Sequence, residues 1–180
     1  MRRRLQLTRR KELPDLADEE HQLLFRRLAD LDMHVQVAVE ARWLPAVLPK
    51  LEASGVKIVM DHFGHPDAEQ GVNCPGFKAM LRSAETGRLW VKLSAAYRLT
   101  WAAAGQKQRD PRTVPLAQGL AQSLLENIGP ERLLWGSDCP FVGFEAAVSF
   151  QDTLDDLTEW VPDAATRRKI SDTALRLYFS

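Results

Sequence analysis

Three ionisable side chains in the sequence each follow a short apolar segment, and their types suit acid–base and anion-binding chemistry. They are His62, Arg98 and Asp138. A carboxylate can take a proton from water, and an imidazole can donate or accept a hydrogen bond near neutral pH. A guanidinium can bind a carboxylate through two parallel hydrogen bonds. These residues are candidates for chemistry if the fold brings their segments to one place.

The apolar segments before these residues are typical of β-strands. β-branched and aromatic residues dominate them, and each segment ends at polar residues. We predict strands at 33–39, 56–61, 89–93 and 132–136, with a further strand at 4–8.

Helical periodicity lies between the predicted strands. After an acidic start at 18–20, Leu24, Leu28 and Leu31 fall on one helix face. Three more helices are predicted from the same spacing, carried by Leu44, Val47, Leu48 and Leu51, by Phe77, Met80, Leu81 and Ala84, and by Leu116, Leu120, Leu124 and Ile128. The segment 144–178 is predicted to be helical throughout, with a break at Pro162.

The alternation of strand and helix predicts an α/β fold with a parallel sheet and right-handed crossovers. The chain length suits one domain, which we place at 1–180. Parallel α/β sheets carry their chemistry at the carboxyl ends of the strands. The candidate residues all follow strands, so they are expected at that edge.

Composition excludes several classes of protein. The 180 residues are 45% hydrophobic and 27% charged, with 24 basic and 24 acidic side chains, which is typical of a globular protein. No apolar run approaches the ~18 residues of a membrane span, and the Arg-rich start is not a secretion signal. Cys74 and Cys139 make no disulfide framework, so we predict a cytoplasmic protein with no membrane partner.

Two of the segments resemble motifs of the amidohydrolase-2 family. They are 59–66 and 132–140, which are similar to the sixth- and eighth-strand motifs, and the stretches 90–98 and 170–178 add to the likeness. The resemblance extends from about Arg4 to Tyr178 and is strongest to the lactonase-type branch, which is like 2-pyrone-4,6-dicarboxylate hydrolase. It implies a (β/α)8 TIM-barrel fold that is incomplete here, because the chain would hold only about strands four to eight.

The resemblance also implies roles for single residues. Asp138 would be the general base or a metal ligand, and His62 would polarise the scissile carbonyl. Arg98 would bind a substrate carboxylate, and Arg4 and Arg10 would do similar work.

Each of these residues also has a purely structural interpretation. Asp138 could cap a helix, His62 could bond to nearby backbone, and Arg98 could be a surface residue on a loop. Tyr97 is a further candidate for binding substrate, because it could line the pocket, but it could also simply pack. Arg4 and Arg10 belong to a basic N-terminal stretch that could bind nucleic acid, but the charge of the chain is balanced and we predict no nucleic-acid partner.

The same likeness predicts that this chain has no metal site and needs no cofactor. The metal-dependent members use a first-strand His-x-His pair and a fifth-strand His, and here the pair is absent and 39–41 reads Val-Glu-Ala. His62 and Asp138 alone are too few ligands for zinc. A divalent metal such as zinc would be expected only in a full-length barrel.

The resemblance therefore implies a hydrolase that opens a carboxylated lactone, or a related cyclic ester, with water activated by Asp138. The expected partner is a small carboxylated molecule. The alternative is an inactive truncated barrel that needs a missing N-terminal half or self-association, as a fragment, a late-called start or a shortened gene. Its open edges predict a homo-oligomer or binding of the dye ANS.

Overall fold

In a computed structural model, residues 3–6, 13–100 and 110–179 are described. The chain divides into two compact units, unit 1 at residues 1–91 and unit 2 at residues 92–180. The expectation of one domain over 1–180 stays a prediction. Strand β4 (Leu89–Leu93) contributes residues to both units.

Unit 1 is built on parallel strands. β1 (Arg3–Gln6), β2 (His34–Ala38) and β3 (Lys57–Met60) follow one another in the sheet, and β3 pairs with the start of β4. Their ends lie within two residues of the predicted strand ends wherever the structure describes those ends. The predicted parallel α/β arrangement is therefore confirmed in this unit. It brings residues 61 onward to the carboxyl end of β3.

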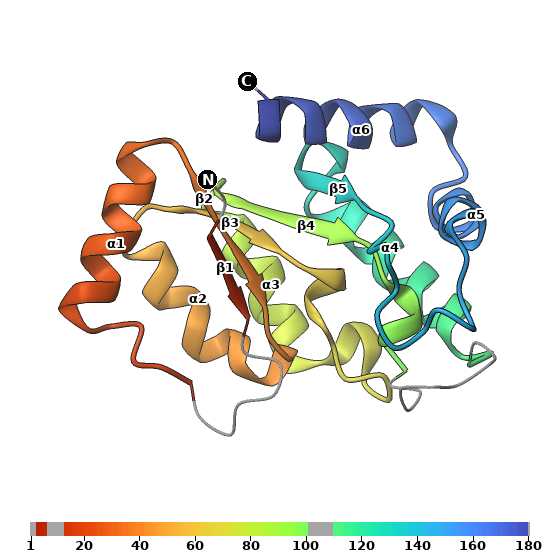
Figure 1. Cartoon of the computed structure of the whole chain (residues 1–180), viewed down its shortest axis with the longest axis horizontal. Coiled ribbons are helices and arrows are strands. Elements are labelled where there is room, and N and C mark those ends of the chain that lie inside the picture. The colour runs from red at the N-terminus through yellow and green to blue at the C-terminus, as the bar shows by residue number, and fades with distance from the viewer. Residues whose placement is uncertain (1–2, 7–12, 101–109, 180) are drawn as a thin grey trace. The chain divides into compact units, whose positions relative to one another are not determined.

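Three helices flank these strands: α1 (Glu19–Asp30), α2 (Leu44–Glu52) and α3 (Pro75–Ala84), as Figure 1 shows. The α2 prediction is confirmed at residue level, because all four residues of its predicted apolar face are buried. α2 packs against both α1 and α3. At the start of α3, a β-carbon on Gly76 would lie 1.8 Å from the Ala41 carbonyl oxygen, so only glycine allows this close approach.

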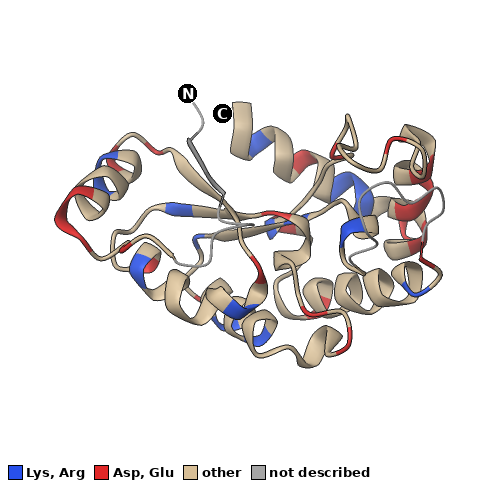
Figure 2. Cartoon of the chain, turned by 60° about the horizontal axis from the view of Figure 1, so that its bottom comes forward, with Lys and Arg blue, Asp and Glu red and all other residues tan. Residues whose placement is uncertain are grey.

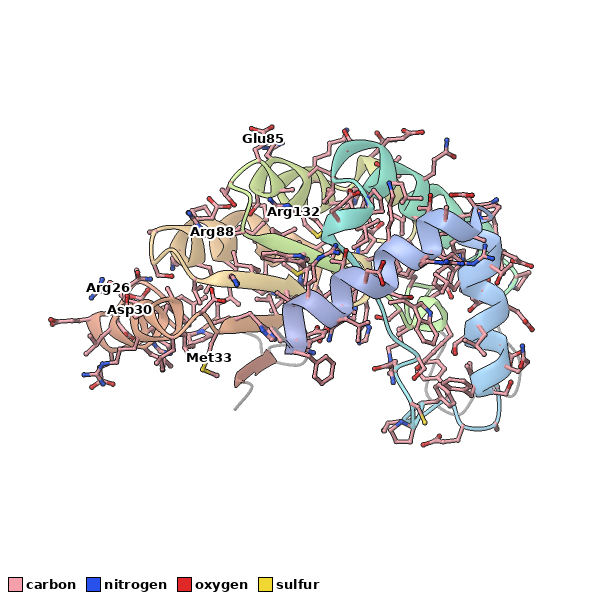
Figure 3. All side chains as sticks on the ribbon, turned by 90° about the horizontal axis from the view of Figure 1, so that it is seen from above. Arg26, Asp30, Met33, Glu85, Arg88 and Arg132 are labelled. Carbon is pink, nitrogen blue, oxygen red and sulfur yellow. The ribbon has the colours of Figure 1, made fainter. Side chains whose placement is uncertain are left out.

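The predicted face of α1 is wrong at its end. Leu31 caps the helix and is 70% exposed, while Phe25 and Leu28 are the buried residues. The helix ends at Asp30, before the last leucine of the predicted face, so Leu31 no longer follows that face. Arg26 and Asp30 lie on the outward side of α1 (Figure 3).

Unit 2 holds the end of β4, strand β5 (Leu133–Trp135) and the helices α4 (Thr113–Asn127), α5 (Phe150–Trp160) and α6 (Ala164–Phe179). The Gly136 amide just after β5 donates to the Leu93 carbonyl at the end of β4, at 3.4 Å. α6 packs on β5, and α4 packs on α5 (Figure 1).

The prediction of continuous helix from residue 144 is wrong. Turns occupy the segment up to Val148, and α5 begins only at Phe150. Ser149 defines this start through a capping box: its hydroxyl accepts from the Asp152 amide, and the Asp152 carboxylate accepts from the Ser149 amide at 2.7 Å. The predicted break near Pro162 is confirmed, because α5 ends at Trp160 and α6 starts at Ala164.

Basic and acidic residues are interspersed along the elements of each unit. Figure 2 shows both kinds on α1, for example. Among the described residues, no helix combines the length and the apolar character that crossing a membrane requires.

Candidate active site

The loops after β3, β4 and β5 share an uncommon backbone conformation. In the described part of the chain, seven residues other than glycine have positive φ, and six of them lie in these loops: His62, Phe63, His65, Ala95, Asp138 and Phe141. Such a conformation costs of order 1–3 kcal/mol for most residues and concentrates at functional sites. The strain falls on the loops that follow the carboxyl ends of the strands.

In unit 2, two donors meet one oxygen of Asp138. The Tyr97 hydroxyl donates to Oδ2 at 2.9 Å, and Arg98 Nε donates to the same atom at 2.8 Å. Tyr97 and Arg98 lie in the short helical turn η4 (Ala96–Arg98) that follows β4. Asp138 has a φ of 62° and caps no helix, since the next helix begins at Phe150. The structural interpretation of Asp138 as a helix cap is therefore wrong.

The Tyr97 ring is enclosed by apolar side chains. It is 3% exposed, and its ring centroid lies 5.0 Å from that of Phe144 and 6.2 Å from that of Phe141. Burial, followed by the negative charge of Asp138 and the hydrogen bond to it, raises the pKa of the Tyr97 phenol well above its ordinary value. The phenol therefore stays protonated near neutral pH and remains a donor to Asp138.

Arg98 retains donors beyond those that hold Asp138. Its Nη2 donates to the Val142 carbonyl at 3.2 Å, and its guanidinium lies over the rings of Tyr97 and Phe144. A guanidinium has five N–H groups, so among the described residues these two bonds leave three for another acceptor. The side chain is 26% exposed, so part of it can be reached from solvent.

His62 lies in unit 1, directly after β3, in a loop built around buried histidines. The rings of His62 and His65 meet edge to face with centroids 4.9 Å apart, and both side chains are buried. The His65 carbonyl accepts from the Ala41 amide at 2.9 Å. The main chain of His65 thus helps to anchor the loop.

Sequence reasoning missed a buried pair beside His62. Asp61 is 1% exposed, and both of its carboxylate oxygens accept from Gln36 Nε2, at 2.9 and 3.0 Å. β2 and β3 run parallel with Gln36 opposite Val59, two residues before Asp61, so both side chains point to one face. The sequence does contain a signal for this pair. Gln36 is a polar residue inside an apolar strand, and Asp61 follows the next strand at a position whose side chain points to the same face.

The structure thus brings together Tyr97, Arg98 and Asp138. Arg4 lies on β1 and His62 lies after β3, both in unit 1. Arg10 lies outside the described residues. Over 3–6, 13–100 and 110–179, no three His, Cys, Asp or Glu side chains gather to hold a metal. The expectation that this chain has no metal site and needs no cofactor stays a prediction.

Known proteins similar to this chain match it along most of its length. A sequence model of the family described as amidohydrolase matches residues 4–179. The 4-sulfomuconolactone hydrolase of Rhizobium radiobacter is 31% identical over 163 residues, which cover 86% of this chain and 52% of that protein. The 2-pyrone-4,6-dicarboxylate hydrolase of Comamonas testosteroni is 29% identical over 160 residues, with coverages of 85% and 51%.

A solved structure from Pseudomonas putida, assigned as a 2-pyrone-4,6-dicarboxylic acid hydrolase, has the same fold. It superposes with a TM-score of 0.86 at 32% identity, over 97% of this chain and 61% of that one. The likeness confirms the predicted incomplete barrel of parallel strands and helices. The chain spans about half the length of the curated relatives that it matches.

Proposed function

The chain belongs to the amidohydrolase family, and from that premise we propose that it hydrolyses a lactone, or a related cyclic ester, that carries carboxylate groups. The observation that carries the proposal is the cluster in which Tyr97 and Arg98 hold Asp138 directly after β5. The names of the relatives support the substrate class, because one opens a sulfonated lactone and another acts on a pyrone dicarboxylate.

Asp138 is the proposed base. Its carboxylate accepts a proton from water while the water oxygen forms a bond to the carbonyl carbon of the lactone. The tetrahedral intermediate then breaks the ring C–O bond. The proton passes from Asp138 to the departing oxygen, so that the net change is the addition of one water and the base is restored.

Arg98 is the proposed anchor for a substrate carboxylate. Its unused N–H groups can bind both oxygens of a carboxylate, and its bond to Asp138 then fixes the anchor beside the base. Pre-placed positive charge also stabilises the negative charge that develops on the substrate. For His62, Arg4 and Arg10, the roles of carbonyl donor and further anion ligands are supported by the sequence resemblance alone.

The first test compares wild type with Asp138→Asn on a panel of carboxylated lactones. Asparagine keeps the shape and tolerates the left-handed backbone, but it cannot accept the proton. We expect kcat to fall about 10²- to 10⁴-fold, the usual contribution of a general base. Asp172→Asn, at an exposed position on α6, is the matched control and should leave the rate unchanged.

Two outcomes would contradict the proposal. An Asp138→Asn variant as fast as wild type would remove Asp138 from the chemistry. A wild-type chain that opens none of the lactones would contradict the hydrolase activity of this 180-residue chain. A cytoplasmic location and the lack of a nucleic-acid partner stay predictions from composition.

A further inference from the structure

Tyr97 lies where it can act on Asp138 but not on a substrate. We propose that Tyr97 is a positioning residue that holds Oδ2 of Asp138, and that binding of the substrate anion belongs to Arg98 and not to Tyr97. The inference rests on the proposed function, in which Asp138 activates water. It replaces the sequence-based expectation that Tyr97 binds substrate.

Tyr97 and Arg98 differ in the number of hydrogen-bond donors that they can offer to a substrate. A phenol has one O–H group, and that of Tyr97 is used on Asp138. Within 3–6, 13–100 and 110–179, Arg98 uses one N–H on Asp138 and one on the Val142 carbonyl, so three of its five remain. As far as the described contacts go, Arg98 has donors left for a ligand and Tyr97 has none.

Tyr97 and Arg98 also differ in how far they are buried. The Tyr97 ring is packed in a cluster with Ala95, Phe141, Phe144 and Val148, and only 3% of the residue is exposed. A substrate would meet neither a face nor an edge of this ring. The side chain of Arg98, by contrast, is 26% exposed.

The position of Asp138 in its loop explains why the hydrogen bonds from Tyr97 and Arg98 are useful. Asp138 lies in an irregular loop in which Phe141 also has positive φ, so contacts from other segments are needed to hold its carboxylate in one orientation. Two hydrogen bonds to one oxygen, from side chains on another loop, fix the rotation of the carboxylate. A general base that is misplaced by ~1 Å can lose about 100-fold in rate.

The test is Tyr97→Phe, which keeps the packed ring and removes only the hydroxyl. Tyr178→Phe is the matched control, because the chain has two tyrosines and Tyr178 lies on α6. With a carboxylated lactone, we expect Tyr97→Phe to lower kcat about 10- to 100-fold at an unchanged KM. A substrate ligand would instead raise KM, and a residue that only packs would change neither.

Binding without turnover separates the two roles directly. The probe is benzene-1,3-dicarboxylate, whose carboxylates have the same relation on a six-membered ring as the 4,6 pair in the relative's named substrate. We expect calorimetry to give the same Kd for wild type and Tyr97→Phe, and a Kd about tenfold higher for Arg98→Lys, which loses the planar fork. Equal weakening by both variants would overturn the inference.

Phenol titration decides the contact with Asp138 even if the chain turns over no lactone. In Tyr178→Phe, the ultraviolet signal of tyrosinate comes from Tyr97 alone. Adding Asp138→Asn removes the negative charge beside the phenol, so the pKa of Tyr97 should fall, although burial still keeps it above the ordinary value. An unchanged titration would overturn the inference, whereas a shifted titration in an inactive chain would contradict only the proposed hydrolase.

Discussion

At the scale of single residues, the buried carboxylate of Asp61 depends on the amide of Gln36. Replacing Gln36 by Leu removes the donor that reaches both oxygens of this 1% exposed residue. We expect the free energy of unfolding to fall by about 1–3 kcal/mol, the usual cost when a buried polar group loses a hydrogen bond. Urea titration followed by circular dichroism measures the change.

Gln122→Leu is the control for this loss. Gln122 is exposed on α4 and donates to Glu126 at 2.9 Å, so its replacement should change stability by less than about 0.5 kcal/mol. If Gln36→Leu were as mild as the control, the pair with Asp61 would contribute nothing to stability.

The residue types of the site were predictable from the sequence, but their contacts were not. Polar residues directly after apolar strands marked Tyr97, Arg98 and Asp138, because parallel strands end at a common edge. The bonds between them depend on left-handed backbone at Ala95 and Asp138. Alanine disfavours that conformation, so no local signal in the sequence could have predicted it at Ala95.

At the scale of elements, the junction of α3 with the turn η1 (Ala41–Trp43) depends on the missing side chain of Gly76. A β-carbon there would overlap the Ala41 carbonyl oxygen at 1.8 Å and the Ala41 β-carbon at 2.9 Å. Gly76→Ala must therefore push α3 away from unit 1's core. We expect a loss of about 1–3 kcal/mol or more, as for overpacked cores, in urea unfolding.

Gly119→Ala is the matched control, since it places the same methyl group on a different helix. Gly119 lies inside α4, where an added β-carbon would meet no other atom within 4 Å, and its φ is helical. There we expect a gain of about 0.5–1 kcal/mol, because alanine is the better helix former. A Gly76→Ala variant that is also stabilised would show that α3 and η1 are not in close contact.

The elements that could be predicted are those in which local pattern and packing agree. In α2 the helical spacing of apolar residues coincides with the buried face. In the segment 144–149 they disagree: Phe144 and Val148 have helical spacing, yet they are buried in turns that pack around Tyr97. Contacts with Tyr97, almost fifty positions away in the sequence, determine the structure of this segment. Hydrophobic periodicity does not detect such contacts.

At the scale of the whole molecule, the strand at one end of the sheet predicts self-association. β1 pairs with β2 on one side, and within the described residues no strand pairs with its other side. An open strand edge presents unpaired backbone donors and acceptors to a second chain. We therefore expect light scattering to show a mass that rises with concentration, accompanied by ANS fluorescence.

The exposed apolar residues of α6 are an alternative cause of self-association. Substitutions distinguish this cause from the open edge of β1. Leu175 and Phe179 are 59% and 78% exposed one helical turn apart, but two such side chains form a small patch of the kind that monomers tolerate. The double variant Leu175→Gln, Phe179→Gln should therefore associate as wild type does, because it leaves the backbone edge of β1 intact. Loss of association in this variant would assign it to α6, and a wild-type monomer without ANS fluorescence at every concentration would contradict the prediction itself.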